Sequence, residues 1–133
     1  MTSTIKIHEK DKVFQIATKE GWVEQTGLQA KVDGIDFAIC PLKKGSNTFI
    51  QVSEVESGGV LLDYPISFID IFTLDTRDKA IEYYKENVIP LIQKKIEVNG
   101  LDEFRKEVEK AKSYMLEKYG ERPEIKDFEE EGK

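Results

Sequence analysis

The spacing of the apolar residues changes once along this chain. Up to about Thr73 apolar and polar residues alternate, with Asp-Gly and Gly-Gly pairs between the runs, which is typical of antiparallel strands joined by tight turns. From Asp75 to Tyr119 the period is 3.6 residues, which is typical of amphipathic helices. Because each pattern leaves an apolar face to bury, we expect sheet and helices to share one core. The sequence therefore predicts an α+β fold, with an N-terminal antiparallel β-meander of about four to five strands packed against two C-terminal helices.

The segment from Leu28 to Ile39 predicts a β-hairpin. Apolar and polar residues alternate on both sides of Asp33-Gly34, a pair that supplies the positive φ values of a two-residue type I′ turn. This turn sets Lys31 opposite Asp36, a favourable cross-strand charge pair. It also places six apolar side chains on one face: Leu28, Ala30, Val32, Ile35, Phe37 and Ile39.

A second hairpin is predicted over residues 49–64, with its turn at residues 56–59. The expected pairs are Val55 with Val60 and Val52 with Asp63. This register mixes apolar and polar side chains on one face, which fits a central strand or a different register. Before this hairpin, Pro41 ends its strand or places it at a sheet edge, and residues 43–47 form a loop.

Residues 11–20 leave two alternatives open. They form either a short helix that begins at Asp11 and ends at Gly21, or a strand with Phe14, Ile16 and Thr18 on one face. The segment is too short for its periodicity to decide between them.

The helical part begins near Asp75 or Thr76, either of which is a suitable N-cap. Pro90 lacks the amide that would bond the carbonyl of Glu86, so we expect the first helix to be kinked near Pro90. Asn99-Gly100 ends this helix, and a second helix occupies residues 101–119.

Charge and length favour one domain, residues 1–120, followed by an acidic, flexible tail, residues 121–133. The tail carries six acids and three bases, so it holds half of the net charge of −6. In the alternative, Ile125 and Phe128 dock onto the domain as a short anchor.

Composition disfavours several partners and compartments. There is no basic stripe of the kind that direct nucleic-acid binding needs, and no apolar stretch long enough to span a membrane. The single cysteine and the absence of a signal-peptide pattern predict a cytoplasmic location.

We predict no catalytic residues, no metal site and no cofactor. The only histidine, His8, is expected to be an exposed strand residue, and Cys40 is expected to be a small packing residue that points away from the Leu28/Phe37 face. One cysteine and one histidine do not make a zinc site, and no phosphate-binding glycine motif is present.

Two tyrosines are the candidate binding residues. Tyr83 lies off the apolar stripe of its helix, and Tyr114 lies at the edge of the stripe that includes Ala111 and Met115. Exposed tyrosines are favoured at interfaces because a rigid ring with a polar tip gives contact area at a low entropy cost. The alternative is that both rings only cover the core.

The sequence favours a small acidic, non-catalytic interaction protein, such as an inhibitor, an immunity-type protein or a regulatory factor. Its partner would be a protein, and its acidity suits a basic or nucleic-acid-binding one. The alternative is a small-molecule or nucleotide binding domain with a pocket between sheet and helices. A homodimer is a separate alternative, and an enzyme is the less favoured class.

Overall fold

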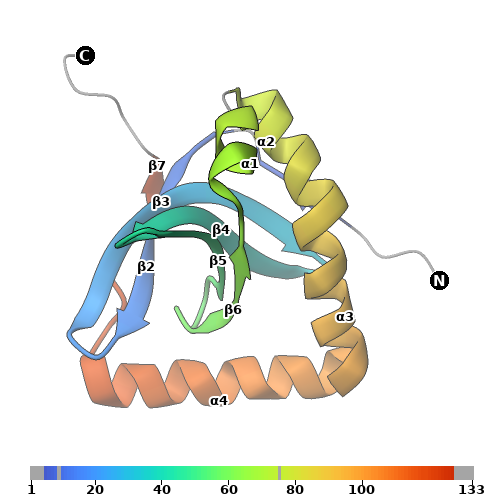
Figure 1. The fold of residues 1–133 in the computed structure, drawn as a ribbon. Helices are drawn as coiled ribbons and strands as arrows, with labels where there is room; N and C mark the ends of the chain where they lie inside the picture. The colour runs from blue at the N-terminus through green and yellow to red at the C-terminus, as the bar shows by residue number, and fades with distance from the viewer. Residues whose placement is uncertain (1–4, 9, 75, 128–133) are drawn as a thin grey trace.

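The computed structural model describes residues 5–8, 10–74 and 76–127, and it has an α+β fold (Figure 1). Within these residues, seven strands form one curled antiparallel sheet of order β6-β5-β4-β3-β2-β7, and β1 pairs with β3. The strands are β1 (Ile5–Ile7), β2 (Lys12–Thr18), β3 (Gly21–Val32), β4 (Ile35–Lys44), β5 (Asn47–Glu54), β6 (Val60–Pro65) and β7 (Lys126–Asp127).

The predicted meander corresponds to β2–β6, and the two short strands β1 and β7 extend it at its margins. Residues 11–20, for which the sequence left a helix and a strand open, contain the strand β2. This strand pairs with β3 along its whole length, from Lys12 opposite Gly27 to Thr18 opposite Gly21. Phe14 and Ile16 are buried, so it is the packing of the strand that decides between the alternatives.

The hairpin between β3 and β4 has the predicted register. Asp33 and Gly34 have φ values of 52° and 84°, as the type I′ turn requires. Lys31 lies opposite Asp36, with Nζ and Oδ1 4.0 Å apart. All six apolar side chains predicted to share a face are buried.

The predicted register of the second hairpin is wrong. Val52 lies opposite Leu62 and Ser53 opposite Val60, with an irregularity between Val52 and Ser53. The turn is longer than expected because Glu54 ends the strand: its carboxylate accepts hydrogen bonds from the amides of Glu56 and Ser57, both at 2.7 Å. The hydrogen bonds of Glu54 to the turn thus accompany a shift of the pairing that sets Val52 opposite the apolar Leu62.

Pro41 does not end β4, which continues to Lys44 and pairs with β5 along the way. It does lie just beyond the last β3–β4 pair, Leu28 opposite Ile39, so its missing amide costs no ladder hydrogen bond. The expected loop at residues 43–47 is tighter than predicted, since Lys44 still pairs with Asn47.

At Gly27 the backbones of β3 and β4 lie very close together. Along β3 this residue adjoins the point where the two strands diverge, since their final pair is Leu28 opposite Ile39. A Cβ atom on Gly27 would lie 2.7 Å from the Cys40 Sγ and would also meet the Ile39 carbonyl oxygen. Only glycine permits this approach. Beyond this point β3 leaves β4 and continues beside β2, so the two strands form a fork.

The two predicted helical segments follow the sheet, and they run down one side and along one end of it (Figure 1). A short helix before them, α1 (Phe68–Thr73), was not predicted, since it lies in the part of the chain assigned to alternating strands. Thr76 is the N-cap of the first long helix, accepting a hydrogen bond from the Lys79 amide at 3.2 Å. The helical elements are α1 (Phe68–Thr73), α2 (Arg77–Tyr83), the π-helical turn η1 (Tyr84–Val88), α3 (Ile89–Asn99) and α4 (Leu101–Tyr119).

The kink predicted near Pro90 is the π-helical turn η1. The amide of Ile89 bonds the carbonyl of Tyr84, five residues earlier. The wider turn immediately precedes the proline, whose ring would otherwise clash with the carbonyl of Glu86. Gly100, with a φ of 85°, then ends α3 and allows α4 to begin at once.

The sheet is buried on both faces. The larger core lies between one face and the helices, and it includes Phe37, Val52, Val88 and Phe104. A smaller core lies on the other face, where β2 curls over β4, and it consists of Phe14, Ile16, Ala38 and Cys40. Because β4 contributes to both cores, residues 37–40 are all buried.

After α4 the chain returns to the sheet, where β7 pairs with β2. Ile125 packs beside the smaller core, as in the anchor alternative. Its expected companion Phe128 lies outside the described residues, as do residues 129–133 of the acidic tail.

We expect Gly27→Ala to destabilise the fold by about 1–3 kcal/mol, because the added methyl group must push β3 away from Cys40. Urea unfolding followed by circular dichroism measures this change. Glu24→Ala, at an exposed site in the same strand, is the control and should change stability by less than about 0.5 kcal/mol. Equal stability of the two variants would contradict the tight approach at the fork.

Candidate functional site

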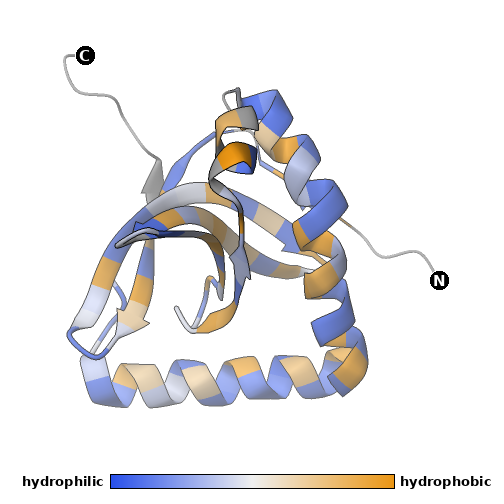
Figure 2. Ribbon diagram, in the orientation of Figure 1, coloured by the Kyte–Doolittle hydropathy of each residue, from blue (hydrophilic) through white to orange (hydrophobic). Residues whose placement is uncertain are grey.

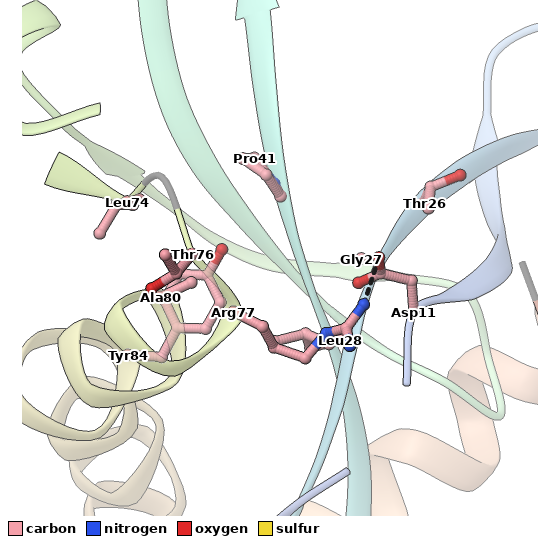
Figure 3. Close-up of a pocket in the computed structure, with 10 residues that line it drawn as sticks. All are labelled: Asp11, Thr26, Gly27, Leu28, Pro41, Leu74, Thr76, Arg77, Ala80 and Tyr84. Carbon is pink, nitrogen blue, oxygen red and sulfur yellow. Dashed lines mark hydrogen bonds and ion pairs between the residues drawn. The ribbon is translucent and has the colours of Figure 1, made fainter. Parts of the chain in front are cut away.

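The fork between β3 and β4 opens into a cavity of about 390 Å³, which α2 covers from the side (Figure 3). Its apolar lining comes from both sheet and helices, through Leu28, Pro41, Leu74 and Ala80. Its polar lining consists of Asp11, Thr26, Thr76 and Arg77, with the ring and hydroxyl of Tyr84 beside them. An apolar cavity with a few converging polar groups is the usual form of a small-molecule site.

Arg77 and Asp11 meet at this cavity, although they are 66 residues apart in the chain (Figure 3). The Arg77 Nη2 donates to the Asp11 Oδ2 at 3.3 Å, and the two side chains are 50% and 38% exposed. A half-exposed pair with one contact contributes little to stability. The remaining guanidinium hydrogens and the second carboxylate oxygen are therefore available to other groups.

Tyr84 lines the same cavity and is buried. Burial, together with the nearby Cys40 and Asp11, raises the pKa of its hydroxyl to about 12. The hydroxyl is therefore neutral at ordinary pH, which leaves it able to donate or accept a hydrogen bond but not to act as a base.

The two predicted binding tyrosines lie on different helices, Tyr83 on α2 and Tyr114 on α4. Tyr83 on α2 is half-buried, and its ring meets that of Tyr64 edge-on at 6.4 Å. Its desolvation and its contacts with Tyr64 raise the pKa of its hydroxyl to about 12, with a further contribution from Asp70 of α1. Tyr114 on α4 is exposed, and its hydroxyl accepts a hydrogen bond from the Lys118 Nζ at 3.2 Å. A binding role for either residue stays a prediction.

Cys40 lies in the smaller core, on the face opposite to Phe37, as its position in the strand predicted. Burial raises the pKa of its thiol to about 12. His8 was predicted to be an exposed strand residue, but it is half-buried and follows the last residue of β1. Its backbone amide still donates to the Gln29 carbonyl at 2.8 Å, which holds it against β3. Neither residue lines the cavity at the fork.

A second hollow, of about 230 Å³, lies where α4 meets the turn after β5. Asp36, Glu54, Glu56 and Glu109 line it together with Arg105. Glu54 is buried, and this burial raises the pKa of its carboxyl, against the effect of its hydrogen bonds from Ser57 and Glu56. In the described part of the chain, no three acidic, cysteine or histidine side chains are grouped so that they could hold a metal ion.

The third feature is the outward side of α1, where Ile69 is 75% and Phe72 66% exposed. Figure 2 colours part of this short helix as strongly hydrophobic. Phe72 also lines a shallow groove of about 800 Å³ together with Pro41, Leu42, Lys43 and Thr48. We call Ile69, Phe72 and this groove the α1 surface.

The sequence did not point to the meeting of Asp11 and Arg77. Neither residue belongs to a motif, since Asp11 precedes a strand and Arg77 opens a helix. Their approach depends on how far β3 bends away from β4, which no local pattern records. The exposure of Ile69 and Phe72 was also missed, because apolar residues in a short segment are expected to be buried.

We expect the Cys40 thiol to resist alkylation at pH 8 in the native protein, because a pKa of about 12 leaves roughly one thiolate per ten thousand thiols. Iodoacetamide labelling followed by mass spectrometry measures this, and labelling should become complete in urea. A Thr26→Cys variant, exposed on the same sheet, should be labelled readily in the native state. Rapid native labelling of Cys40 would contradict its burial.

For Glu54→Gln we expect a pH-dependent change in stability. The folded-state pKa of Glu54 is raised, so its stabilising contribution is fully present below the ordinary value of about 4.5 and is lost as the pH rises through the folded-state pKa. The advantage of the native protein over the variant should therefore decrease from pH 4 to pH 8 in urea unfolding. An advantage that grows with pH would mean that the turn's amides outweigh the effect of burial.

No family model matches this chain, and no curated protein or solved structure shows significant similarity to it. Among the described helices, none is both long enough and apolar enough to cross a membrane.

Proposed function

We propose that this chain is a small acidic, non-catalytic interaction protein that binds a protein partner through the α1 surface. The observation that carries this proposal is the exposure of Ile69 and Phe72, two large apolar side chains on one short helix. Clustered apolar side chains with a polar surround are typical of protein interaction sites. The adjoining groove gives a partner's side chain a place to insert.

Charge suggests the chemistry of the partner. The net charge of −6 attracts a basic protein at long range, and such attraction mainly raises the association rate. Among the described residues that line the groove, however, the charged one is Lys43, which disfavours a basic group within the groove. The partner that fits is thus a basic protein that inserts an apolar side chain beside Phe72.

Tyr83 supports the same location. Asp70 of α1 lies close enough to raise the pKa of the Tyr83 hydroxyl, so Tyr83 lies near α1. Its ring packs edge-on against Tyr64 of β6, which connects α1 to the sheet. The groups with the most reactive chemistry have structural tasks instead, since Cys40 fills the smaller core and Glu54 holds a turn.

The test compares capture of partners by immobilised native protein and by an Ile69→Ser/Phe72→Ser variant. We expect the variant to lose at least tenfold in affinity for a partner that the native protein retains, because the apolar contact is removed. Leu91→Ser/Val98→Ser, an exposed apolar pair on α3, is the matched control and should bind normally. Affinity for the native protein should fall as salt rises.

Two results would contradict the proposal. A captured partner that binds both double variants equally would place the interface elsewhere. A native protein that is a dimer by light scattering, with a monomeric α1 variant, would show that a second copy covers the α1 surface.

A further inference from the structure

We propose that the cavity at the fork binds a small zwitterion, namely an α-amino acid with an apolar side chain. Its carboxylate would lie on Arg77, its ammonium group on Asp11, and its side chain between α2 and the sheet. This site shares Pro41 with the groove of the α1 surface but includes neither Ile69 nor Phe72, and it does not depend on the proposed protein partner.

The charges of the cavity match a zwitterion better than an ion of one sign. Arg77 comes from α2 and Asp11 from the segment before β2, and both line the same cavity. An anion alone would face the carboxylate of Asp11, and a cation alone would face the guanidinium of Arg77. A zwitterion places an opposite charge against each group and exchanges one weak ion pair for two charge-assisted contacts.

The existing Asp11–Arg77 contact leaves room for this exchange. It joins one guanidinium nitrogen to one carboxylate oxygen at 3.3 Å, so the guanidinium group of Arg77 does not bind both oxygens of Asp11. Figure 3 shows the Arg77 side chain extended across the cavity toward Asp11. A ligand carboxylate can therefore take two guanidinium hydrogens with a small movement of the side chain.

The remaining lining suits an aliphatic or aromatic side chain. Leu28 of β3 and Ala80 of α2 line the cavity from the sheet and from the helix, and Tyr84 adds an aromatic ring to the lining. Pro41 has no amide, so this side of the fork presents no backbone donor at that position. Thr26 and Tyr84, which also line the cavity, each carry a hydroxyl group.

Size and charge also separate this ligand from a nucleotide. The cavity of about 390 Å³ lies at the small end of the range of ligand sites. Among the described residues of its lining Arg77 is the one basic residue, and the carboxylate of Asp11 lies beside it, so a phosphate group would not be favoured. The nucleotide version of the sequence-based alternative is thus less suited to this cavity than a neutral zwitterion.

The experiment titrates the native protein with L-leucine and L-phenylalanine, using calorimetry and thermal unfolding. The matched probes are 3-methylbutylamine, which lacks the carboxylate of leucine, and 4-methylpentanoate, which lacks its ammonium group. We expect at least one amino acid to bind and to raise the melting temperature, and each matched probe to bind at least tenfold more weakly than leucine. Arg77→Met and Asp11→Asn should each weaken amino-acid binding at least tenfold, while Lys94→Met, exposed on α3, should not.

Three outcomes would overturn the inference. The first is no heat and no rise in melting temperature with any apolar amino acid up to about 10 mM, well above the usual range of specific ligand affinities. The second is binding of 4-methylpentanoate as tight as that of leucine and unaffected by Asp11→Asn, which would indicate an anion site. The third is amino-acid binding that both cavity variants retain, which would place the site elsewhere.

The Ile69→Ser/Phe72→Ser variant separates this test from that of the proposed function. It should bind amino acids normally, because neither residue lines the cavity at the fork. If this variant loses partner capture but still binds amino acids, the two sites act independently. A failure of amino-acid binding in the native protein would then overturn only the inference about the cavity, and a failure of partner capture only the proposed function.

Discussion

The close approach of Gly27 to Cys40 is the constraint on which the rest of this structure depends. Because no side chain separates the two backbones there, β3 can leave β4 and curl with β2 over the opposite face of the sheet. That curl creates the smaller core around Phe14 and Cys40. The same separation of strands opens the fork that α2 covers, so the cavity is a consequence of how the sheet bends and not of an irregular loop.

A sheet buried on both faces limits where function can reside. The central strand β4 gives alternate residues to the two cores, and this assigns Cys40 to packing. Glu54, the buried acid, is engaged by the amides of its own turn. Outside these cores lies the margin of the sheet, where α1 and α2 lead from the strands to the helical layer. Both the α1 surface and the cavity lie at this margin, and Leu74 and Thr76 in the cavity lining directly follow α1.

The local features were predictable wherever one residue type is strongly required. Asp33-Gly34 specified a turn that only positive φ values allow, and the alternation around it then determined the pairing of six apolar residues. Thr76, Pro90 and Gly100 likewise marked where helices begin, widen and end. The prediction failed at Glu54, where a carboxylate bound to nearby amides lengthened the turn and shifted the register. Side-chain hydrogen bonds of this kind leave no periodic trace.

By itself, then, the sequence determined the α+β class, the position of the two long helical segments after the sheet, the first hairpin and the face on which Cys40 lies, because each follows from backbone preferences or from residue spacing. The tertiary structure alone decided that residues 12–18 form a strand, that β3 bends at Gly27 and that Asp11 meets Arg77. These outcomes depend on contacts between segments far apart in the chain, whose energies no local pattern contains. Both candidate sites therefore became visible only once the sheet was curled and the helices were placed against it.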